Sequence, residues 1–205
     1  ASLKAGDEVR LTGFGVFGRI FFGSFSGNGT LRSDNGNNTT VVFNIGALNT
    51  NSTFSGTIVA NGSQAIALEK VGTGTLVLSG NNTFNGFTTI SNGVLQLGAG
   101  GAAGNIGSTI ITNYSKLVFS YNRGDTFAFP AILITGTGSL SFTNTGTGTM
   151  TLTGTNTETG DTTIAAGTVR LLNPLALSGG SGAGNVILNG TLDLNSNNVV
   201  INGLS

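Results

Sequence analysis

The chain repeats one stretch of its own sequence at a distance of 74 residues. Residues 72–97 read GTGTLVLSGNNTFNGFTTISNGVLQL, and residues 146–171 align with them without a gap, with 14 of 26 positions identical. Each copy contains three short runs in which apolar and polar residues alternate, separated by Gly, Asn and Thr. Alternation indicates strands with one buried face, and such short strands must pack on neighbours. Repeated units of this kind are typical of a solenoid.

The phase of the alternation predicts which side chains enter the core. In the first copy Val77, Thr89 and Gln96 are expected to point outward. The apolar residues that alternate with them are expected to point inward in both copies: Leu76, Leu78, Ile90, Leu95 and Leu97, and their counterparts Met150, Leu152, Ile164, Val169 and Leu171.

The spacing of the copies favours parallel coils over hairpins. A distance of 74 residues would be roughly three coils of about 20–25 residues. The whole chain then predicts a right-handed parallel β-helix (a β-solenoid) of about eight to nine coils, stacked about 4.8 Å apart. The recurrent Asn-Gly and Ser-Gly pairs would also suit hairpin turns, so an antiparallel sandwich is the structural alternative.

The chain divides into two parts by composition. Residues 1–22 hold a cluster of phenylalanines and are predicted to be either an N-terminal cap over the first coil or a segment that docks on another subunit. Residues 23–205 are predicted to form the solenoid. Within it, residues 98–107 (GAGGAAGNIG) are expected to be a flexible loop of small residues, and residues 178–185 echo them.

Residues 70–98 carry a family pattern, K-x-G-x-G-T-L-x-L-S-G-x-N-T-F-x-G, followed by T-T-I-x-x-G-x-L-x-L-G. This stretch resembles the passenger-associated repeat of bacterial autotransporters. It departs from the pattern at Phe87, where a glycine is usual, and the second copy has Glu158 where the aromatic residue is expected. The resemblance implies a right-handed β-helix that is extracellular or on the bacterial cell surface. It implies no single activity, because such passengers include adhesins, proteases and toxins.

The charge balance excludes several classes of partner. Eight basic residues balance eight acidic ones, and charged residues are 8% of the chain, against about a quarter in ordinary domains. Such a chain has no electrostatic footprint for nucleic acid or anionic lipid. No run approaches the roughly 18 apolar residues of a membrane-spanning helix. Cysteine is absent, so neither disulfides nor thiol chemistry are available.

The residue types needed for catalysis are scarce. Histidine is absent, which removes the usual general base and the Ser-His-Asp triad. Glu158 and Asp161 are the two acids close enough in sequence to form a carboxylate pair, and they stand where the first copy has Phe84 and Phe87. The repeat therefore does not need them, and both are expected to be solvated turn residues. We predict no catalytic residue, no cofactor and no metal site, and hence no enzyme.

These observations predict a structural or adhesive extracellular role. Cell-surface or matrix glycans are candidate partners. The alternative functions are a carbohydrate-binding or carbohydrate-cleaving β-helix, and a fragment of a longer autotransporter passenger. Because Trp is absent and Tyr occurs twice, at Tyr114 and Tyr121, aromatic platforms for sugars are few.

The two ends of the chain predict self-assembly. The C-terminal sequence, NNVVINGLS, contains apolar residues that a neighbouring coil would cover. The sequence SFSGNGTL, near the N-terminal end, resembles the coil that would follow it. Copies are therefore expected to stack head to tail into a filament. The interface would join Phe14, Phe17, Phe21 and Phe22 of one copy to Val199, Val200, Ile201 and Leu204 of the next. In the alternative, a covalently attached next coil covers the end.

Overall fold

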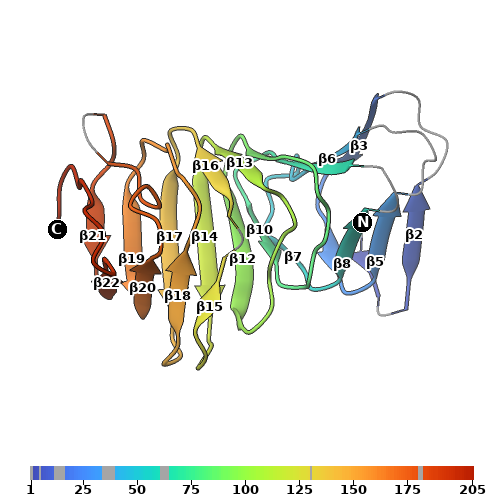
Figure 1. Ribbon diagram of the computed structural model, residues 1–205. Coiled ribbons are helices and arrows are strands. Elements are labelled where there is room, and N and C mark those ends of the chain that lie inside the picture. Colours follow the sequence, from blue (N-terminus) through green and yellow to red (C-terminus); the bar gives the residue numbers. More distant parts are fainter. Residues whose placement is uncertain are drawn as a thin grey trace.

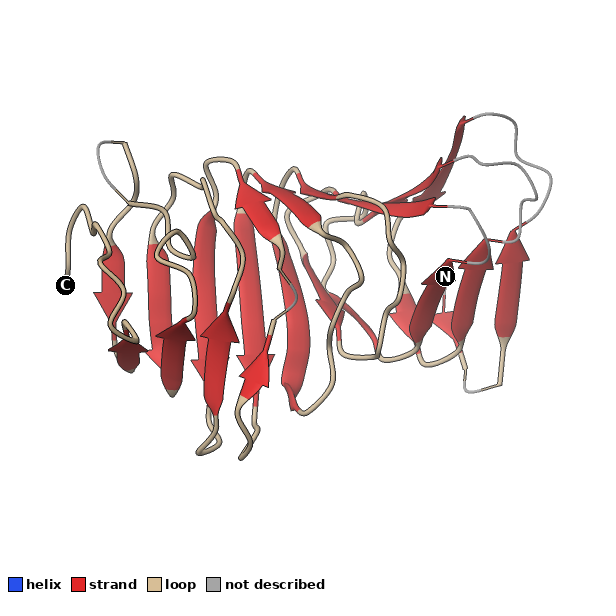
Figure 2. Ribbon diagram, viewed as in Figure 1, coloured by secondary structure: helices blue, strands red, loops and turns tan. Residues whose placement is uncertain are grey.

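The computed structural model describes residues 2–4, 6–11, 17–33, 40–60, 65–129, 131–179 and 182–205. These ranges contain strands and turns but no helix (Figure 2). None of them therefore offers a helix that is long and apolar enough to cross a membrane. The strands stack side by side into an elongated body, with the N-terminal strands at one end and the C-terminal strands at the other (Figure 1).

The described strands form four sheets, and every named strand pair in them is parallel. The nine-stranded sheet has the order β1 (Ser2–Leu3), β4 (Ser26–Gly27), β7 (Ser52–Phe54), β10 (Thr75–Leu78), β12 (Val94–Gly101), β14 (Lys116–Tyr121), β17 (Ser139–Asn144), β19 (Thr162–Ala166), β21 (Val186–Leu188). The six-stranded sheet has the order β16 (Leu133–Thr135), β13 (Ile110–Asn113), β11 (Thr88–Ile90), β9 (Ala65–Lys70), β6 (Thr40–Ile45), β3 (Phe17–Phe22). The four-stranded sheet comprises β15 (Phe127–Ala128), β18 (Thr149–Leu152), β20 (Thr168–Leu171) and β22 (Thr191–Asp193). The three-stranded sheet comprises β2 (Glu8–Leu11), β5 (Thr30–Ser33) and β8 (Thr57–Ala60).

This pairing confirms the parallel β-solenoid and excludes the antiparallel sandwich. The described residues make about seven turns, slightly fewer than the eight to nine predicted. The first and last turns contribute short strands, of two residues in β1 and three in β21 and β22. The strands within residues 1–22 belong to the same sheets as the strands that follow them. Strands β1, β2 and β3 pair in parallel with β4, β5 and β6, respectively.

The two copies of the repeat lie on different faces of the solenoid. In the first copy β10 and β12 belong to the nine-stranded sheet, whereas their counterparts β18 and β20 belong to the four-stranded sheet. The register explains the offset, because three turns lead from Leu76 to Leu140, and Met150 comes on the following strand. The distance of 74 residues is thus three turns and one further strand. The repeat determines which side chains point into the core and which point outward, but it does not determine which face of the solenoid its strands occupy.

The core consists of columns of apolar side chains that stack from turn to turn. One column follows the paired register through Phe54, Leu78, Leu97, Phe119, Phe142 and Ile164. All six are at most 2% exposed. The rings of Phe119 and Phe142 stack with centroids 4.9 Å apart and planes 5° from parallel, as the spacing between adjacent parallel strands requires. All ten residues predicted to point inward are buried, and Val77, Thr89 and Gln96 are partly exposed.

The glycines that the two copies share allow neighbouring turns to approach closely. A Cβ atom on Gly80 would collide with the carbonyl oxygen of Gly56 on the preceding turn. Its counterpart Gly154 would collide in the same way with the carbonyl of Ile132. The spacing of the repeat is therefore set by backbone contacts at these corners as well as by the core columns.

The small-residue stretch after the first copy differs from the prediction. The first four of its residues, 98–101, form the end of strand β12, although we expected a flexible loop. The pairing of β12 with β14 shifts register between Leu97 and Gly101. Such a shift marks a β-bulge, which small residues permit because there is no bulky side chain to place.

The core phase leads to a stability test. Substitution Leu78→Asp places a charge in the apolar column and is expected to lower the free energy of unfolding by about 4 kcal/mol. Substitution Val77→Asp, one position along the same strand, places the charge at the partly exposed face and should cost less than about 1 kcal/mol. Equal midpoint losses in chemical denaturation of the two variants would show that the strand phase is wrong.

Candidate functional site

The repeat carries an asparagine that points inward in both copies. Asn82 is 1% exposed, and its Oδ1 accepts a hydrogen bond from the Ile58 amide at 3.0 Å. Its Nδ2 donates to the carbonyls of Gly80 and Asn105. A buried amide with these partners links three successive turns, because Ile58 lies on the turn before it and Asn105 on the turn after.

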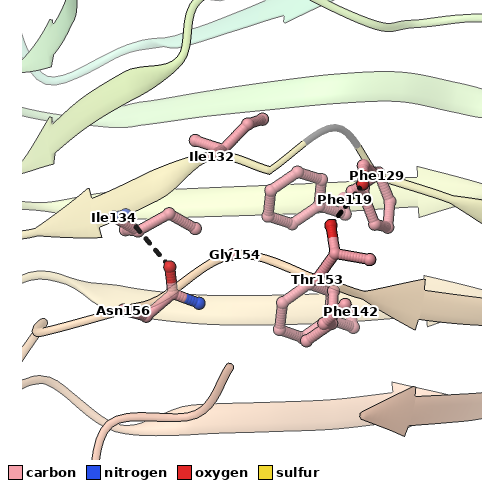
Figure 3. Close-up of a pocket in the computed structure, with 9 residues that line it drawn as sticks. Phe119, Phe129, Ile132, Ile134, Phe142, Thr153, Gly154 and Asn156 are labelled. Atoms are coloured by element: carbon pink, nitrogen blue, oxygen red, sulfur yellow. Dashed lines mark hydrogen bonds between the residues drawn. The ribbon is translucent and has the colours of Figure 1, made fainter. Parts of the chain in front are cut away.

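The counterpart, Asn156, repeats this arrangement. Its Oδ1 accepts from the Ile134 amide at 3.0 Å, and its Nδ2 donates to the Ala176 carbonyl at 2.6 Å. Figure 3 shows the side chain beside a small apolar void of about 20 Å³, which is lined chiefly by phenylalanine and isoleucine side chains. A void of this size holds at most a water molecule and is not a ligand site.

Glu158, two residues after Asn156, is buried, which contradicts the predicted solvated turn. It is 0% exposed, because alternation along residues 155–159 turns it inward, as it turns Phe84 inward in the first copy. Asp161 is exposed, as predicted, and its Oδ1 accepts a hydrogen bond from the Asn185 amide at 2.8 Å. The two acids therefore do not form the carboxylate pair that a hydrolase would need.

A pocket of about 360 Å³ adjoins Glu158. Threonines 155, 157 and 159 line one part of it, and Leu175, Leu177 and Ser178 line another. Glu158 is the single ionisable residue among the described residues that line it. Neither carboxylate oxygen of Glu158 has a hydrogen-bond partner in the described structure. The first copy fills the equivalent inward position with Phe84, so the second copy has exchanged a well-packed ring for a buried acid.

Burial raises the pKa of Glu158 from its ordinary value of 4.5 to about 7. The cause is the desolvation of the charged form. The Glu158 and Ser178 amides and the Ser178 hydroxyl lie near enough to offset part of that rise, although none of them has the geometry of a hydrogen bond to the carboxylate. The carboxyl group is thus largely protonated in mildly acidic solution and becomes charged near neutrality. We therefore regard this group and its pocket as the candidate functional site in the described part of the chain.

A buried lysine, Lys70, has a structural role. It is 1% exposed, and its Nζ donates to the carbonyls of Val71, Gly72 and Asn92. Burial lowers its pKa. Its counterpart in the second copy, Asn144, likewise donates to the carbonyl of Gly148 at the corner between two strands. Both side chains bond to backbone carbonyls that the turn leaves unpaired. In the sequence, Lys70 occupies the first position of the repeat pattern, and Asn144 occupies the equivalent position of the second copy.

Of the residues predicted for the assembly interface, those that the structure describes lie at opposite ends of the solenoid (Figure 1). Phe21 is 69% exposed on the edge strand β3, and Val200 and Leu204 are each 64% exposed at the other end. Phe22, Val199 and Ile201 are partly buried against the core. Phe14 and the side chain of Phe17 lie outside the described residues.

No group of three or more His, Cys, Asp or Glu side chains in the described ranges is placed to hold a metal ion. Two segments, residues 68–97 and 142–171, match the family described as the passenger-associated-transport-repeat. Both matched segments are therefore similar to this repeat. They include both halves of the internal repetition and the two inward asparagines, so the family pattern is the unit from which these turns are built.

The chain is also similar to a protein named Adhesin BmaC autotransporter, from Brucella suis biovar 1 (strain 1330). The two are 40% identical over 103 residues, which is 50% of this chain and 3% of the Brucella protein. The chain therefore spans a small part of that relative's length. No solved structure matches this chain. The passenger-associated-transport repeats and this relative confirm the resemblance seen in residues 70–98.

The position of Glu158 predicts a pH dependence of stability. Its pKa is raised on folding, so the folded state binds more protons than the unfolded state between pH 4.5 and about 7. The free energy of unfolding should therefore fall by roughly 3 kcal/mol as the pH rises through that window. Above it, Glu158 should cause no further change in stability. Chemical denaturation of the wild-type protein at pH 4.5 and pH 8 measures the difference.

Two variants assign that difference to Glu158. Glu158→Gln removes the ionisable group from the pocket and should abolish most of the fall in stability. Asp161→Asn removes an exposed carboxylate three residues away and keeps an acceptor for the Asn185 amide, so the fall should persist. If Glu158→Gln kept the wild-type pH profile, the burial of an ionisable carboxyl group at this position would be refuted.

Proposed function

We propose that this chain is a stretch of an autotransporter passenger that acts as an adhesive, non-catalytic scaffold on the surface of a bacterium or outside it. The observation that carries this proposal is the pair of passenger-associated-transport repeats, built into a continuous parallel solenoid. The similar protein from Brucella is named an adhesin. The length of that relative supports the view that such turns form part of a much longer rod.

The surface chemistry supports adhesion over catalysis. Glu158 is buried without a second carboxylate beside it among the described lining residues, and the chain contains no histidine. The outward positions of the repeat are mostly Thr, Ser and Asn. Such a surface offers many hydrogen-bonding groups and little net charge, so contact with a partner depends on shape and hydrogen bonds rather than on electrostatic attraction.

The proposal includes end-to-end stacking of solenoids. The edge strands β1, β2 and β3 at one end, and β21 and β22 at the other, have a partner on one side within their sheets. Residues 203–205 already begin a further row, because Leu204 forms a parallel bridge with Val186. Exposed apolar residues accompany these edges at Phe21, Val200 and Leu204. A second copy placed head to tail would continue both the ladders and the core columns.

Adhesion can be tested with the purified chain coupled to beads. Beads that carry the wild-type chain should be retained on animal epithelial cells or on surfaces coated with extracellular matrix at least tenfold more than beads that carry the Leu78→Asp variant. The reason is that the binding surface needs stacked turns, which the charge inside the core column destabilises. Equal retention of both kinds of bead at matched coupling density would contradict an adhesive function for this stretch.

Stacking can be tested by substitution at the C-terminal end. Leu204→Asp and Val200→Asp place charges on the proposed contact and should shift the chain from long assemblies to monomers in analytical ultracentrifugation and electron microscopy. Phe87→Asp is the matched control, because Phe87 is 46% exposed on the side of the solenoid and the second copy already has Asp161 there. A wild-type chain that stays monomeric at high concentration would overturn the stacking proposal.

A further inference from the structure

A second pocket, of about 150 Å³, lies on the side of the solenoid next to the first repeat. One side of it comes from the turn at Asn81, and another from the small-residue stretch at Asn105. The following turn adds Tyr121, Arg123 and Phe127. The pocket is separate from the Glu158 site, with which it shares no lining residue. It is smaller than the roughly 300–1,000 Å³ of pockets that enclose drug-sized molecules.

Two side-chain amides at this pocket are free to bind a ligand. Asn81 and Asn105 are both exposed, and none of the hydrogen bonds in the described structure involves their side chains. Their backbones, however, are fixed by the buried Asn82, whose backbone amide and Nδ2 both donate to the carbonyl of Asn105, at 3.1 and 3.2 Å. Asn81 and Asn105 therefore lie on adjacent turns, whose backbones are about 4.8 Å apart along the solenoid axis.

The wall formed by the small-residue stretch is also fixed. The hydroxyl of Tyr121 donates to the carbonyl of Gly104 at 2.8 Å, and this bond is buried. Gly104 has a φ of +126°, and a Cβ on it would collide with the backbone of Gly98. The small residues of this stretch leave room for the pocket, while the tyrosine holds the backbone in place. A preformed pocket loses little entropy when it binds a ligand.

Arg123 lines the remaining part of the pocket, and its charge is balanced by Asp125 beside it. The guanidinium group of Arg123 donates to both carboxylate oxygens of Asp125, from Nε at 3.0 Å and from an Nη atom at 2.5 Å. Its Cζ lies 4.2 Å from the centroid of the Phe127 ring. A paired guanidinium and carboxylate give fixed donors and acceptors with little net charge. The pocket thus combines planar polar groups with an apolar wall at Phe127 and Ala128.

We propose that this pocket binds one monosaccharide unit of an uncharged glycan. Sugar hydroxyls act as both donors and acceptors, and the two asparagine amides supply both kinds of partner on adjacent turns. Arg123 offers its remaining N–H donors to further hydroxyls, its pairing with Asp125 avoids favouring an anionic ligand, and the apolar wall takes the C–H face of the sugar ring. A pocket of this volume accommodates one small ring. A site on the side of the rod also leaves the rest of a glycan chain free in solution.

The second repeat provides a natural comparison. Its equivalents of Asn81 and Asn105 are Thr155 and Gly179. Both residues line the pocket beside Glu158, so each repeat leaves a pocket at the same place relative to its own turns. The pocket beside Glu158 lacks the equivalents of both amides and the aromatic wall, and it is therefore not assigned to a sugar.

The inference rests on the proposed adhesive function, to which it adds a ligand class, and it is tested by direct binding. The full chain, labelled with ¹⁵N, is titrated with the methyl glycosides of glucose, galactose, mannose and N-acetylglucosamine. At least one should bind with a dissociation constant in the millimolar range, as expected for a small ligand on an open site. The side-chain amide signals of Asn81 and Asn105 should shift with saturation.

A double variant and a matched control locate the site. Asn81→Ala combined with Asn105→Ala removes two exposed amides that bond to nothing in the protein, so the fold should persist while the affinity falls at least tenfold. Asn85→Ala removes an exposed asparagine of the same turn outside the pocket and should leave the affinity unchanged. The proposal is overturned if no glycoside gives saturable shifts up to on the order of 100 mM, if the double variant binds as the wild type does, or if charged sugars alone bind.

The bead experiment separates this inference from the adhesive function. If the double variant adheres as strongly as the wild type and the glycosides do not compete, the sugar site is refuted and adhesion stands. If the wild type binds a glycoside but its beads are not retained, adhesion is refuted and the sugar site stands. Competition by the bound glycoside on animal cells identifies a host glycan as the source. Competition on plates coated with bacterial polysaccharide identifies the bacterium's own glycan, and either result supports the proposal.

Discussion

Parallel hydrogen bonding between successive turns is the constraint on which the whole structure depends. It fixes the turns at about 4.8 Å, and every other feature adjusts to that spacing. Side chains in the core must stack on side chains of similar width, as Phe119 does on Phe142. Corners must bring one backbone against another, which is why Gly80 and Gly154 have no room for a Cβ atom.

The same constraint explains why polar residues are found inside. A solenoid changes direction several times in each turn, and each corner leaves backbone amides and carbonyls without strand partners. Asn82 and Asn156 satisfy such groups with a single amide, and Lys70 does so with an ammonium group. Glu158 occupies an inward position without comparable partners. It is the local exception to a rule that the other buried polar side chains at the corners of both repeats obey.

The parallel solenoid, the inward residues and the family could be predicted, because each depends on the alternation or the repeat spacing that the sequence itself contains. It did not predict the environment of Glu158. A single acid in a turn rich in threonine looks solvated, and only the phase of residues 155–159 relative to the core shows that it is buried. The pockets could not be predicted from the sequence either, because each is formed by turns whose lateral alignment depends on the exact length of every coil. The free amides at Asn81 and Asn105 become neighbours only through that alignment.

The displacement of the second repeat by one face has a geometric consequence for longer arrays. A unit that recurs after a whole number of turns would present its features in a straight row along one side of the rod. A unit that recurs after three turns and one strand places each copy at a new azimuth. Successive copies then follow a slow spiral around the rod, and a partner approaching from any direction meets a repeat surface at some height.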